Sequence, residues 1–396
     1  MASPLFQPFV TEGVYARWAG VPRQVLYEAE RVEGPTPVTF PQAEPDFYDP
    51  SPLRYDFPAV TLTTLRDVAV RGRSNLLTAP DAILRHGLIN PPGEVIPEEF
   101  YARIALGDNW NAGAWVSTDP FNVDYLPEAA VFVDGVAFNY AHWLTEVLPR
   151  IAAFARDPGR TAIPLIVDSD LHANIMRSIA LVAGPDVTIY QLAPDRLVRV
   201  GVLHNVSPTG YVPFKLRQDT DQPICHGLFS GQALGEMVGR LRRASVGADT
   251  GAARPKLLIR RNSSLRHIVN EDEIEQALVA RGFVVIEPER LSLEEQVALY
   301  SSAKMVLGAT GAAMANLAFC QPDCPTVVLM PKFRETAYWY WRRIAAAAGA
   351  GAVIHVSGEQ LTPTEDPYHP LAVHQDFRVE LKDVLDAVAA AEALSG

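Results

Sequence analysis

The architecture of the second half of the chain is set by the stretch Met305-Val-Leu-Gly-Ala-Thr-Gly-Ala-Ala-Met-Ala-Asn-Leu-Ala-Phe319. Its apolar start predicts a buried strand over 305–308, and the small residues that follow predict a tight turn into a helix over 311–319. Further strands and helices alternate with this pair, with strands at 256–260, 283–287, 326–330 and 352–356 and helices at 271–281, 293–303 and 336–348. Strict alternation of this kind predicts a doubly wound α/β domain around a parallel sheet.

A similar but less regular alternation runs through the first half of the chain from residue 126 onward. Its predicted strands lie at 130–133, 164–168, 187–191 and 197–204, and its predicted helices lie at 140–155 and 171–183. This pattern predicts a second Rossmann-like domain. We therefore divide the chain into an N-terminal domain over 1–225, a connection over 226–255 and a C-terminal domain over 256–396. Within the first domain, 1–125 is irregular and β-rich and 126–225 is Rossmann-like.

The composition excludes several classes of function. A chain of 396 residues with 48% hydrophobic and 20% charged residues is long enough for two globular domains. A net charge of −12 argues against nucleic acid as the main partner. The absence of a long apolar stretch, a secretory signal and a C-x-x-C pair argues against a membrane span, export, a disulfide framework and a zinc site. We expect a cytoplasmic protein; peripheral contact with the inner membrane and the oligomeric state stay open.

The turn after the strand at 305–308 has the features of an anion site. Ligands of doubly wound sheets lie beyond the carboxyl ends of the strands. Gly308 and Gly311 let a ligand approach the backbone, and the helix that follows at Ala312 presents unpaired N–H groups. The alternative is a tight packing turn with no ligand. The G-x-G-x-x-G spacing of dinucleotide sites is missing, which argues against a nicotinamide oxidoreductase.

Three cations follow the first strand of the same domain, at Arg260, Arg261 and Arg266. Guanidinium groups bind phosphate oxygens in pairs, so these residues can neutralise a diphosphate without a metal ion. The alternative is a solvated basic loop that pairs with the acidic start of the next helix. Four further residues are candidates for binding the ligand that carries this diphosphate. They are the helix N-cap Asn270, Glu287 at a strand end as a partner for ribose hydroxyls, Thr310 and Asn316.

The first half carries its chemistry in Asn139-Tyr-Ala-His-Trp-Leu-Thr-Glu146. With Asn139 as N-cap, His142 lies in the first turn of the helix and Glu146 lies one turn later on the same face. We expect the helix N-terminus to lower the pKa of His142 and keep it neutral, as a general base requires, and Glu146 to orient it. The alternative is a packing contact of His142 and Trp143.

Asp168 follows a buried strand and forms the triplet Asp168-Ser-Asp170, which has the D-x-D form of metal-dependent glycosyltransferases. Such triplets are also frequent at strand ends and helix N-caps, so the metal interpretation is the weaker one. Asp168 stays an alternative catalytic base.

Taken together, these segments resemble glycosyltransferase family 61. The resemblance rests on Asn139-Tyr140-x-His142-Trp143-x-x-Glu146-x-x-Pro149-Arg150 in the first half, and on Arg260-x-x-Ser263-x-x-Arg266-x-x-x-Asn270-Glu271, Gln296 and Gly308-x-x-Gly311-Ala312-x-x-x-Asn316 in the second. It covers residues 130–350. The family often has His where this chain has Thr310, which can still donate to a phosphate but supplies no charge.

The resemblance implies a GT-B-like fold, in which two Rossmann-like domains face a cleft, with the donor held by the C-terminal domain and the acceptor by the N-terminal one. It implies an inverting, metal-independent transferase without a cofactor that moves a sugar from a nucleotide-sugar donor to a glycan or glycolipid, as in bacterial capsular or exopolysaccharide synthesis. Two alternatives stay open: a nucleotide-sugar or phosphate-binding module without catalysis, and a metal-dependent transferase that uses Asp168 and Asp170.

Overall fold

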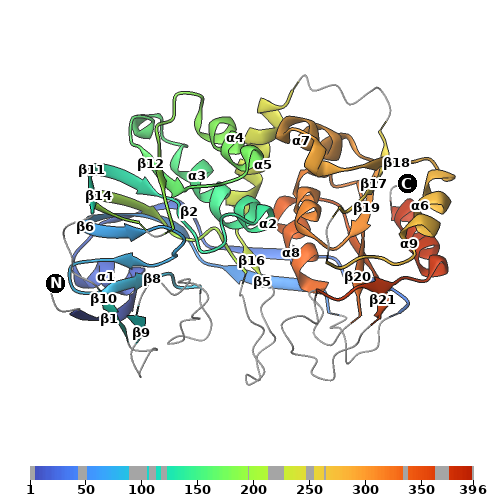
Figure 1. Cartoon of the computed structure of the whole chain (residues 1–396), viewed down its shortest axis with the longest axis horizontal. Coiled ribbons are helices and arrows are strands. Elements are labelled where there is room, and N and C mark those ends of the chain that lie inside the picture. Colours follow the sequence, from blue (N-terminus) through green and yellow to red (C-terminus); the bar gives the residue numbers. More distant parts are fainter. Residues whose placement is uncertain are drawn as a thin grey trace. The chain divides into compact units, whose positions relative to one another are not determined.

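The structure is a computed structural model in which two compact units form (Figure 1). One unit is Met1–Glu30 with Pro58–Lys215, and the other is Arg31–Phe57 with Leu216–Gly396. The residues that the structure describes are 5–42, 51–88, 105–106, 113–116, 123–194, 196–212, 227–246, 254–262, 265–332, 338–361 and 374–394. Residues 226 and 247–253 of the predicted connection, Ser263 of the quoted motif and the first residues of the helix predicted at 336–348 lie outside them.

The first unit is built on one large sheet. Its parallel part has the order β13-β12-β11-β14, from β11 (Asp124–Val131), β12 (Leu165–Asp168), β13 (Ile189–Leu192) and β14 (Leu197–Val206). The strand order reverses between β11 and β14. Rossmann-like folds have the same reversal between their first and fourth strands. Antiparallel pairing of β14 with β6 (Val60–Arg71) then extends the sheet through β7 (Leu77–Thr78), β8 (Ile83–Arg85), β1 (Leu5–Thr11), β10 (Gly113–Val116) and β9 (Ala105–Leu106), and β2 (Arg23–Tyr27) pairs with β6.

The second unit contains a parallel sheet of order β18-β17-β19-β20-β21. Its strands are β17 (Lys256–Ile259), β18 (Phe283–Ile286), β19 (Met305–Ala309), β20 (Thr326–Pro331) and β21 (Val353–Gln360), which confirms the five predicted strands. The order reverses between β17 and β19. Helices α6 (Glu271–Val279) and α9 (Leu381–Leu394) pack on one face, while α5 (Gly231–Ala244), α7 (Leu293–Ser302), the 3₁₀ helix η6 (Ala312–Phe319) and α8 (Tyr338–Ala348) pack together on the other (Figure 1). The mixed α/β class is therefore confirmed.

Residues 31–57 lie in the second unit, whereas the sequence placed them with the N-terminal domain. Strand β4 (Val38–Phe40) pairs with β21, and β3 (Glu30–Gly34) pairs with β5 (Leu53–Phe57). The hydroxyl of Tyr55 donates to the carbonyl of Phe229 at 2.9 Å. Helix α5, predicted as part of a connection, packs with α7 and α8 in the same unit. Pairing between strands more than 300 residues apart leaves no local pattern, so the sequence could not show it.

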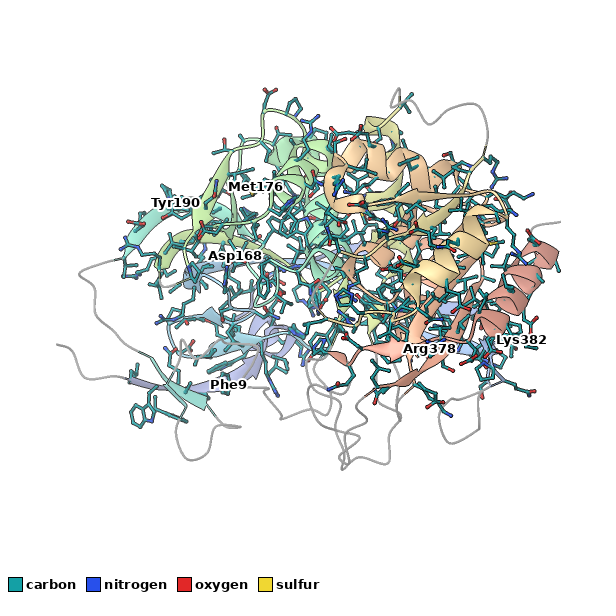
Figure 2. All side chains as sticks on the ribbon, turned by 45° about the vertical axis from the view of Figure 1, so that its right-hand side comes forward. Phe9, Asp168, Met176, Tyr190, Arg378 and Lys382 are labelled. Carbon is teal, nitrogen blue, oxygen red and sulfur yellow. The ribbon has the colours of Figure 1, made fainter. Side chains whose placement is uncertain are left out.

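Side chains fill the space between the helices and the sheets (Figure 2). Asp168 is 1% exposed at the end of β12, whereas Lys382 and Arg378 lie at the surface. Among the described residues, none of the helices combines the length and the apolar character that crossing a membrane requires.

Candidate functional site

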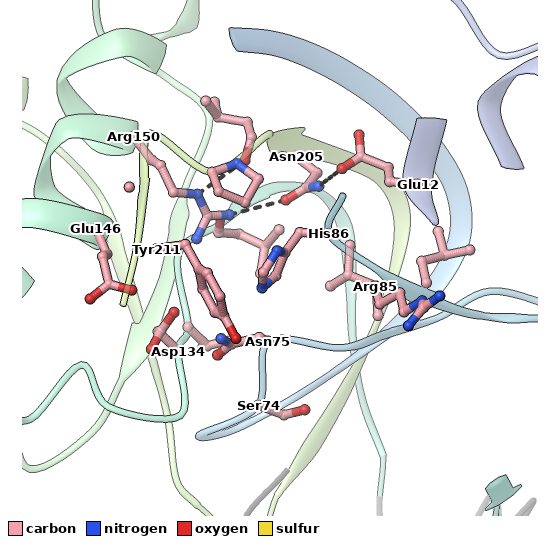
Figure 3. A pocket seen from close by; sticks show the side chains of 17 residues that line it. Glu12, Ser74, Asn75, Arg85, His86, Asp134, Glu146, Arg150, Asn205 and Tyr211 are labelled. Atoms are coloured by element: carbon pink, nitrogen blue, oxygen red, sulfur yellow. Dashed lines mark hydrogen bonds between the residues drawn. The ribbon is translucent and has the colours of Figure 1, made fainter. Parts of the chain in front are cut away.

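A cavity opens in the first unit at the point where its strand order reverses (Figure 3). The ends of β11 and β14 lie side by side there, because Val131 pairs with Asn205. The cavity is lined by Glu12, Ser74, Asn75, Leu77, Leu84, Arg85, His86, Val131, Val133, Asp134, Glu146, Arg150, Asn205, Val206, Pro208, Gly210 and Tyr211. This is the place at which open α/β sheets bind their ligands.

Arg150 joins the ends of the two strands. Its Nε donates to the carbonyl of Val206 at 3.0 Å, and its Nη2 donates to the carbonyl of Val131 at 3.3 Å and to Oδ1 of Asn205 at 3.1 Å. The guanidinium also lies over the ring of Phe132, 5.6 Å from its centroid. The carbonyls at the end of a separating strand pair lose their ladder partners, and Arg150 replaces them. Arg150 therefore has a structural task at the reversal point.

The predicted pair of His142 and Glu146 forms. Oδ1 of Asn139 accepts the N–H of Ala141 at 3.0 Å, as expected of an N-cap. Nδ1 of His142 lies 2.5 Å from Oε1 of Glu146, whose Oε2 accepts the N–H of Val212 at 3.0 Å. Both oxygens of Glu146 are thus held, and its position fixes the imidazole.

The sequence predicted one continuous α-helix over 140–155, but the helix that carries this pair is interrupted. It consists of α2 (Tyr140–His142), a π-helical turn η3 (Trp143–Val147) and α3 (Leu148–Phe154). Pro149 has no N–H, and its ring would crowd the carbonyl four residues earlier, so a regular α-helix is interrupted before it. Single π turns inside helices are frequent at functional sites.

The expected pKa shift of His142 is wrong in direction. Burial does lower the pKa, but the charge of Glu146, its hydrogen bond and the charge of Asp134 outweigh burial, and the pKa is raised. Two carboxylates close to the imidazole stabilise its charged form more than the single short helix turn destabilises it. His142 is therefore a strong proton acceptor.

Asp134 is a site residue that the sequence analysis missed. It follows β11, is 7% exposed, and its Oδ1 accepts the N–H of Val136 at 2.9 Å. Its carboxylate lies next to that of Glu146 in the cavity (Figure 3). Burial, followed by the charge of Glu146, raises the pKa of Asp134 to about 6. The signal was present, since an acid directly follows a buried strand, which is the pattern that singled out Asp168.

Asp168, the alternative base, is engaged with the backbone. Its Oδ1 accepts the N–H of Arg73 at 2.6 Å and its Oδ2 accepts the N–H of Asp134 at 2.9 Å. Burial raises the pKa of Asp168 to about 7, although these two hydrogen bonds act in the opposite direction. The side chain of Asp170 bonds to its neighbour Ser169 at 3.1 Å. No group of three His, Cys, Asp or Glu residues with metal-binding geometry occurs within the described ranges.

The N-terminal β-rich region, from which no function could be inferred, contributes to this cavity. Oε2 of Glu12, at the start of α1 (Glu12–Trp18), accepts from Nδ2 of Asn205 at 2.6 Å. The ring of His86 packs edge-on against Tyr211 at 4.8 Å, and burial followed by the charge of Arg150 lowers its pKa to about 3. His86 is thus a neutral wall of the cavity.

The second candidate site lies at the reversal point of the second sheet, between β17 and β19. Nη1 of Arg261 donates to the carbonyl of Thr310 at 2.5 Å. A Cβ on Gly311 would lie 3.1 Å from that same Nη1, and a Cβ on Gly308 would lie 2.8 Å from Cβ of Ile259. Gly308 therefore allows close packing of β19 against Ile259, and Arg261 packs directly on the Gly311 turn.

Arg266 belongs to the same place. Burial, and then the positive charge of Arg261, lower the pKa of Arg266 to about 10. Its backbone has φ of +60°, an uncommon conformation for a residue with a side chain. Its Nε is buried without a hydrogen-bond partner in the part of the chain that the structure describes. Two guanidinium groups thus lie close enough to repel each other beside the Gly311 turn.

The other predicted donor-site residues have partners elsewhere. Arg260 forms an ion pair with Glu275 of α6. Glu287 pairs with Arg290 at 2.7 Å. Asn270 occupies the N-cap position but uses its side chain to donate to the carbonyl of Val379 at 2.8 Å.

Within the turn motif, Asn316 and Thr310 serve the packing. Asn316 is 0% exposed and donates to Oε1 of Gln296 at 2.8 Å. Oγ1 of Thr310 accepts from Nε1 of Trp341 at 3.1 Å. Ala312 begins η6 beside the turn. The structure therefore brings together Arg261, Arg266, Gly308, Thr310, Gly311 and Ala312, whereas the side chains of Arg260, Asn270, Glu287 and Asn316 bond to other residues.

A comparison with known families finds one family whose model spans residues of both candidate sites. The model of the family described as glycosyltransferase 61 matches residues 140–329, a span that begins at α2 and ends in β20. It includes the pair of His142 and Glu146 as well as Arg261, Arg266 and the Gly311 turn. None of the curated proteins compared with this chain matches it. The chain therefore carries a domain of the glycosyltransferase 61 family over these residues and is a glycosyltransferase.

Proposed function

We propose that this protein transfers a sugar from a nucleotide-sugar donor to a hydroxyl group of a glycan or glycolipid, with inversion and without a metal ion. The observation that carries the proposal is the pair of Arg261 and Arg266 beside the Gly311 turn. Their mutual repulsion, together with the buried Nε of Arg266, is unfavourable without an anion. A donor diphosphate supplies that anion.

The second unit stabilises the leaving group in this proposal. Arg261, which packs on the Gly311 turn, and Arg266 neutralise the charge that develops as the bond to the sugar breaks. Preorganised donors of this kind each contribute about 3 kcal/mol to lowering a barrier. Two partly buried guanidinium groups can take the role that a metal ion has in other transferases.

The first unit provides the proton acceptor. His142 takes the proton of the acceptor hydroxyl, the acceptor oxygen forms its bond to the anomeric carbon, and the bond from that carbon to the diphosphate oxygen breaks. Glu146 holds the ring, and the charges of Glu146 and Asp134 stabilise the imidazolium that results. One displacement inverts the anomeric configuration.

The metal-dependent alternative has less support from the geometry. It needs free carboxylate oxygens on Asp168 and Asp170, yet both oxygens of Asp168 accept backbone N–H groups. Our proposal keeps the GT-B arrangement, the cytoplasmic location and the role in capsular or exopolysaccharide synthesis that the resemblance implies.

The experiment is a thermal-shift panel of UDP-, GDP-, CMP- and TDP-sugars, followed by donor turnover with and without EDTA. A ligand at 100 times its Kd stabilises the folded protein by about 2.7 kcal/mol, which appears as a raised Tm. We expect one nucleotide class to raise the Tm and turnover to persist in EDTA. The proposal is overturned if none of the donors raises the Tm. Loss of turnover in EDTA would support the metal-dependent alternative.

A further inference from the structure

A short ladder of backbone contacts places His374 next to the arginine pair. The segment before and within β22 (Phe377–Arg378) runs along the loop that follows β17. The N–H of Arg266 donates to the carbonyl of His374 at 3.3 Å, and the N–H of Phe377 donates to the carbonyl of His267 at 2.9 Å. Ile268 and Phe377 form a parallel bridge. The position of His374 beside Arg266 is therefore fixed by the backbone.

Two buried nitrogen atoms without partners belong to these two neighbouring residues. Nδ1 of His374 and Nε of Arg266 are both buried, and neither has a hydrogen-bond partner within the described residues. Buried polar nitrogens without partners are rare in folded proteins and call for an explanation, such as a bound ligand. Here they lie on two residues whose backbones are bonded to each other, so one ligand can satisfy both.

The charges around the imidazole are positive. Burial, followed by the charges of Arg266 and Arg261, lowers the pKa of His374. The other titratable groups of the elements packed here are directed to partners of their own: Asp376 accepts the N–H of His267, Glu273 pairs with Arg378, and Glu271 faces Arg260 and His267. Burial and the two guanidinium groups therefore disfavour the protonated form of His374 while no anion is bound.

We propose that His374 is a third binding residue of the donor diphosphate and that donor binding makes it take up a proton. This inference rests on the proposed function of the arginine pair. A diphosphate brings negative charge between the two guanidinium groups, which reverses the sign of the field at the imidazole. The imidazolium then donates a hydrogen bond to a phosphate oxygen. The occupied site has three cations, whereas the empty site has two.

The consequence is a link between pH and donor affinity. Because the bound state holds one more proton than the free state, affinity rises as the pH falls, by at most about tenfold per pH unit. A diphosphate that is esterified at both ends is fully ionised around neutral pH, so the ligand itself contributes no proton. A sugar nucleotide is for this reason a better probe than a free nucleoside diphosphate.

The test is isothermal titration calorimetry with UDP-glucose, GDP-mannose and TDP-glucose, in two buffers of different ionisation enthalpy, from pH 6 to pH 8. We expect the protein to take up close to one proton per ligand bound at the acid end of the range. His374→Gln keeps a polar side chain that does not titrate, so uptake and the pH dependence of Kd should both disappear. His267→Gln, on the same ladder, is the matched control and should behave like the unchanged protein.

Two outcomes separate this inference from the proposed function. If His374→Gln takes up the proton as before, the inference is wrong and the donor site stands. If none of the three sugar nucleotides binds the unchanged protein, the donor site itself fails. Should the variant not fold, NMR of the unchanged protein decides, because the imidazole signals of His374 must shift to the protonated position on donor binding.

Discussion

Both sheets reverse their strand order, between β11 and β14 in the first unit and between β17 and β19 in the second, but they gather opposite charges there. The first reversal point collects buried carboxylates and an imidazole, and Arg150, which lies there too, is bonded to strand carbonyls. The second collects Arg261 and Arg266. The strand topology determines where a site forms, whereas the side chains determine its chemistry.

The two places also differ in how their charges are balanced. In the first unit His142 lies against Glu146, so positive and negative groups compensate each other inside the protein. In the second unit burial, and then the charge of Arg261, lower the pKa of Arg266, whose Nε is buried without a partner in the described chain. The first arrangement suits transfer of a proton, and the second suits binding of an anion. Four substitutions test this difference between the two sites.

The largest effect is expected for His142→Ala, which removes the proton acceptor. Turnover should fall by about 10²- to 10⁴-fold, because general base catalysis is worth that much, while donor affinity stays unchanged. Steady-state kinetics and a donor thermal shift measure the two quantities. His204→Gln is the matched control, since His204 also pairs with a carboxylate, Glu128 at 2.8 Å, on the same sheet. Near-normal turnover of the His142 variant would remove His142 from the mechanism.

The next largest effect is expected for Arg266→Ala, compared with Arg260→Ala. Loss of Arg266 should lower kcat/KM by roughly 10²-fold, which corresponds to about 3 kcal/mol of stabilisation of the leaving group. Arg260 is bound to Glu275 at the surface, so its loss should cost less than about 1 kcal/mol. Equal losses in the two variants would contradict the assignment of the anion site to Arg261 and Arg266.

Asp134→Asn should shift a pH profile. The charge of Asp134 raises the pKa of His142, so its removal lowers that pKa. Because a base must be unprotonated to act, the acidic limb of the profile of kcat/KM against pH should move to lower pH. Asparagine can still accept the N–H of Val136. An acidic limb that stays in place would show that Asp134 does not act on His142.

The smallest effect concerns the scaffold of the second site. Asn316→Ala leaves Oε1 of Gln296 without the donor that it has at 2.8 Å, and should lower the free energy of unfolding by about 1–3 kcal/mol. Donor affinity should stay within a few-fold of the original, because Asn316 is fully buried and its amide donates to Gln296. Thermal unfolding and the calorimetric Kd measure the two effects. A large loss of affinity would return Asn316 to the donor site.

Several parts of the site followed from local patterns. The alternation of strands and helices, the cap at Asn139, the spacing of His142 and Glu146 and the glycines at 308 and 311 all depend on residues within a few positions of one another. The choice among Arg260, Arg261 and Arg266 did not follow, because adjacent residues leave a strand end in different directions. In the folded chain Arg260 pairs with Glu275 on α6, whereas Arg261 donates to the carbonyl of Thr310.

Periodicity along the chain was enough to predict an α/β protein with a parallel strand series in each half and to locate a basic turn and a His–Glu pair, because those features depend on short-range spacing. Folding in three dimensions added what no spacing encodes: residues 31–57 in the second unit, Asp134 beside Glu146, and His374 beside Arg266. These groups are far apart in sequence, and long-range strand pairing brings them together. Their charges act on each other only at that short distance, so their protonation too is a property of the folded chain.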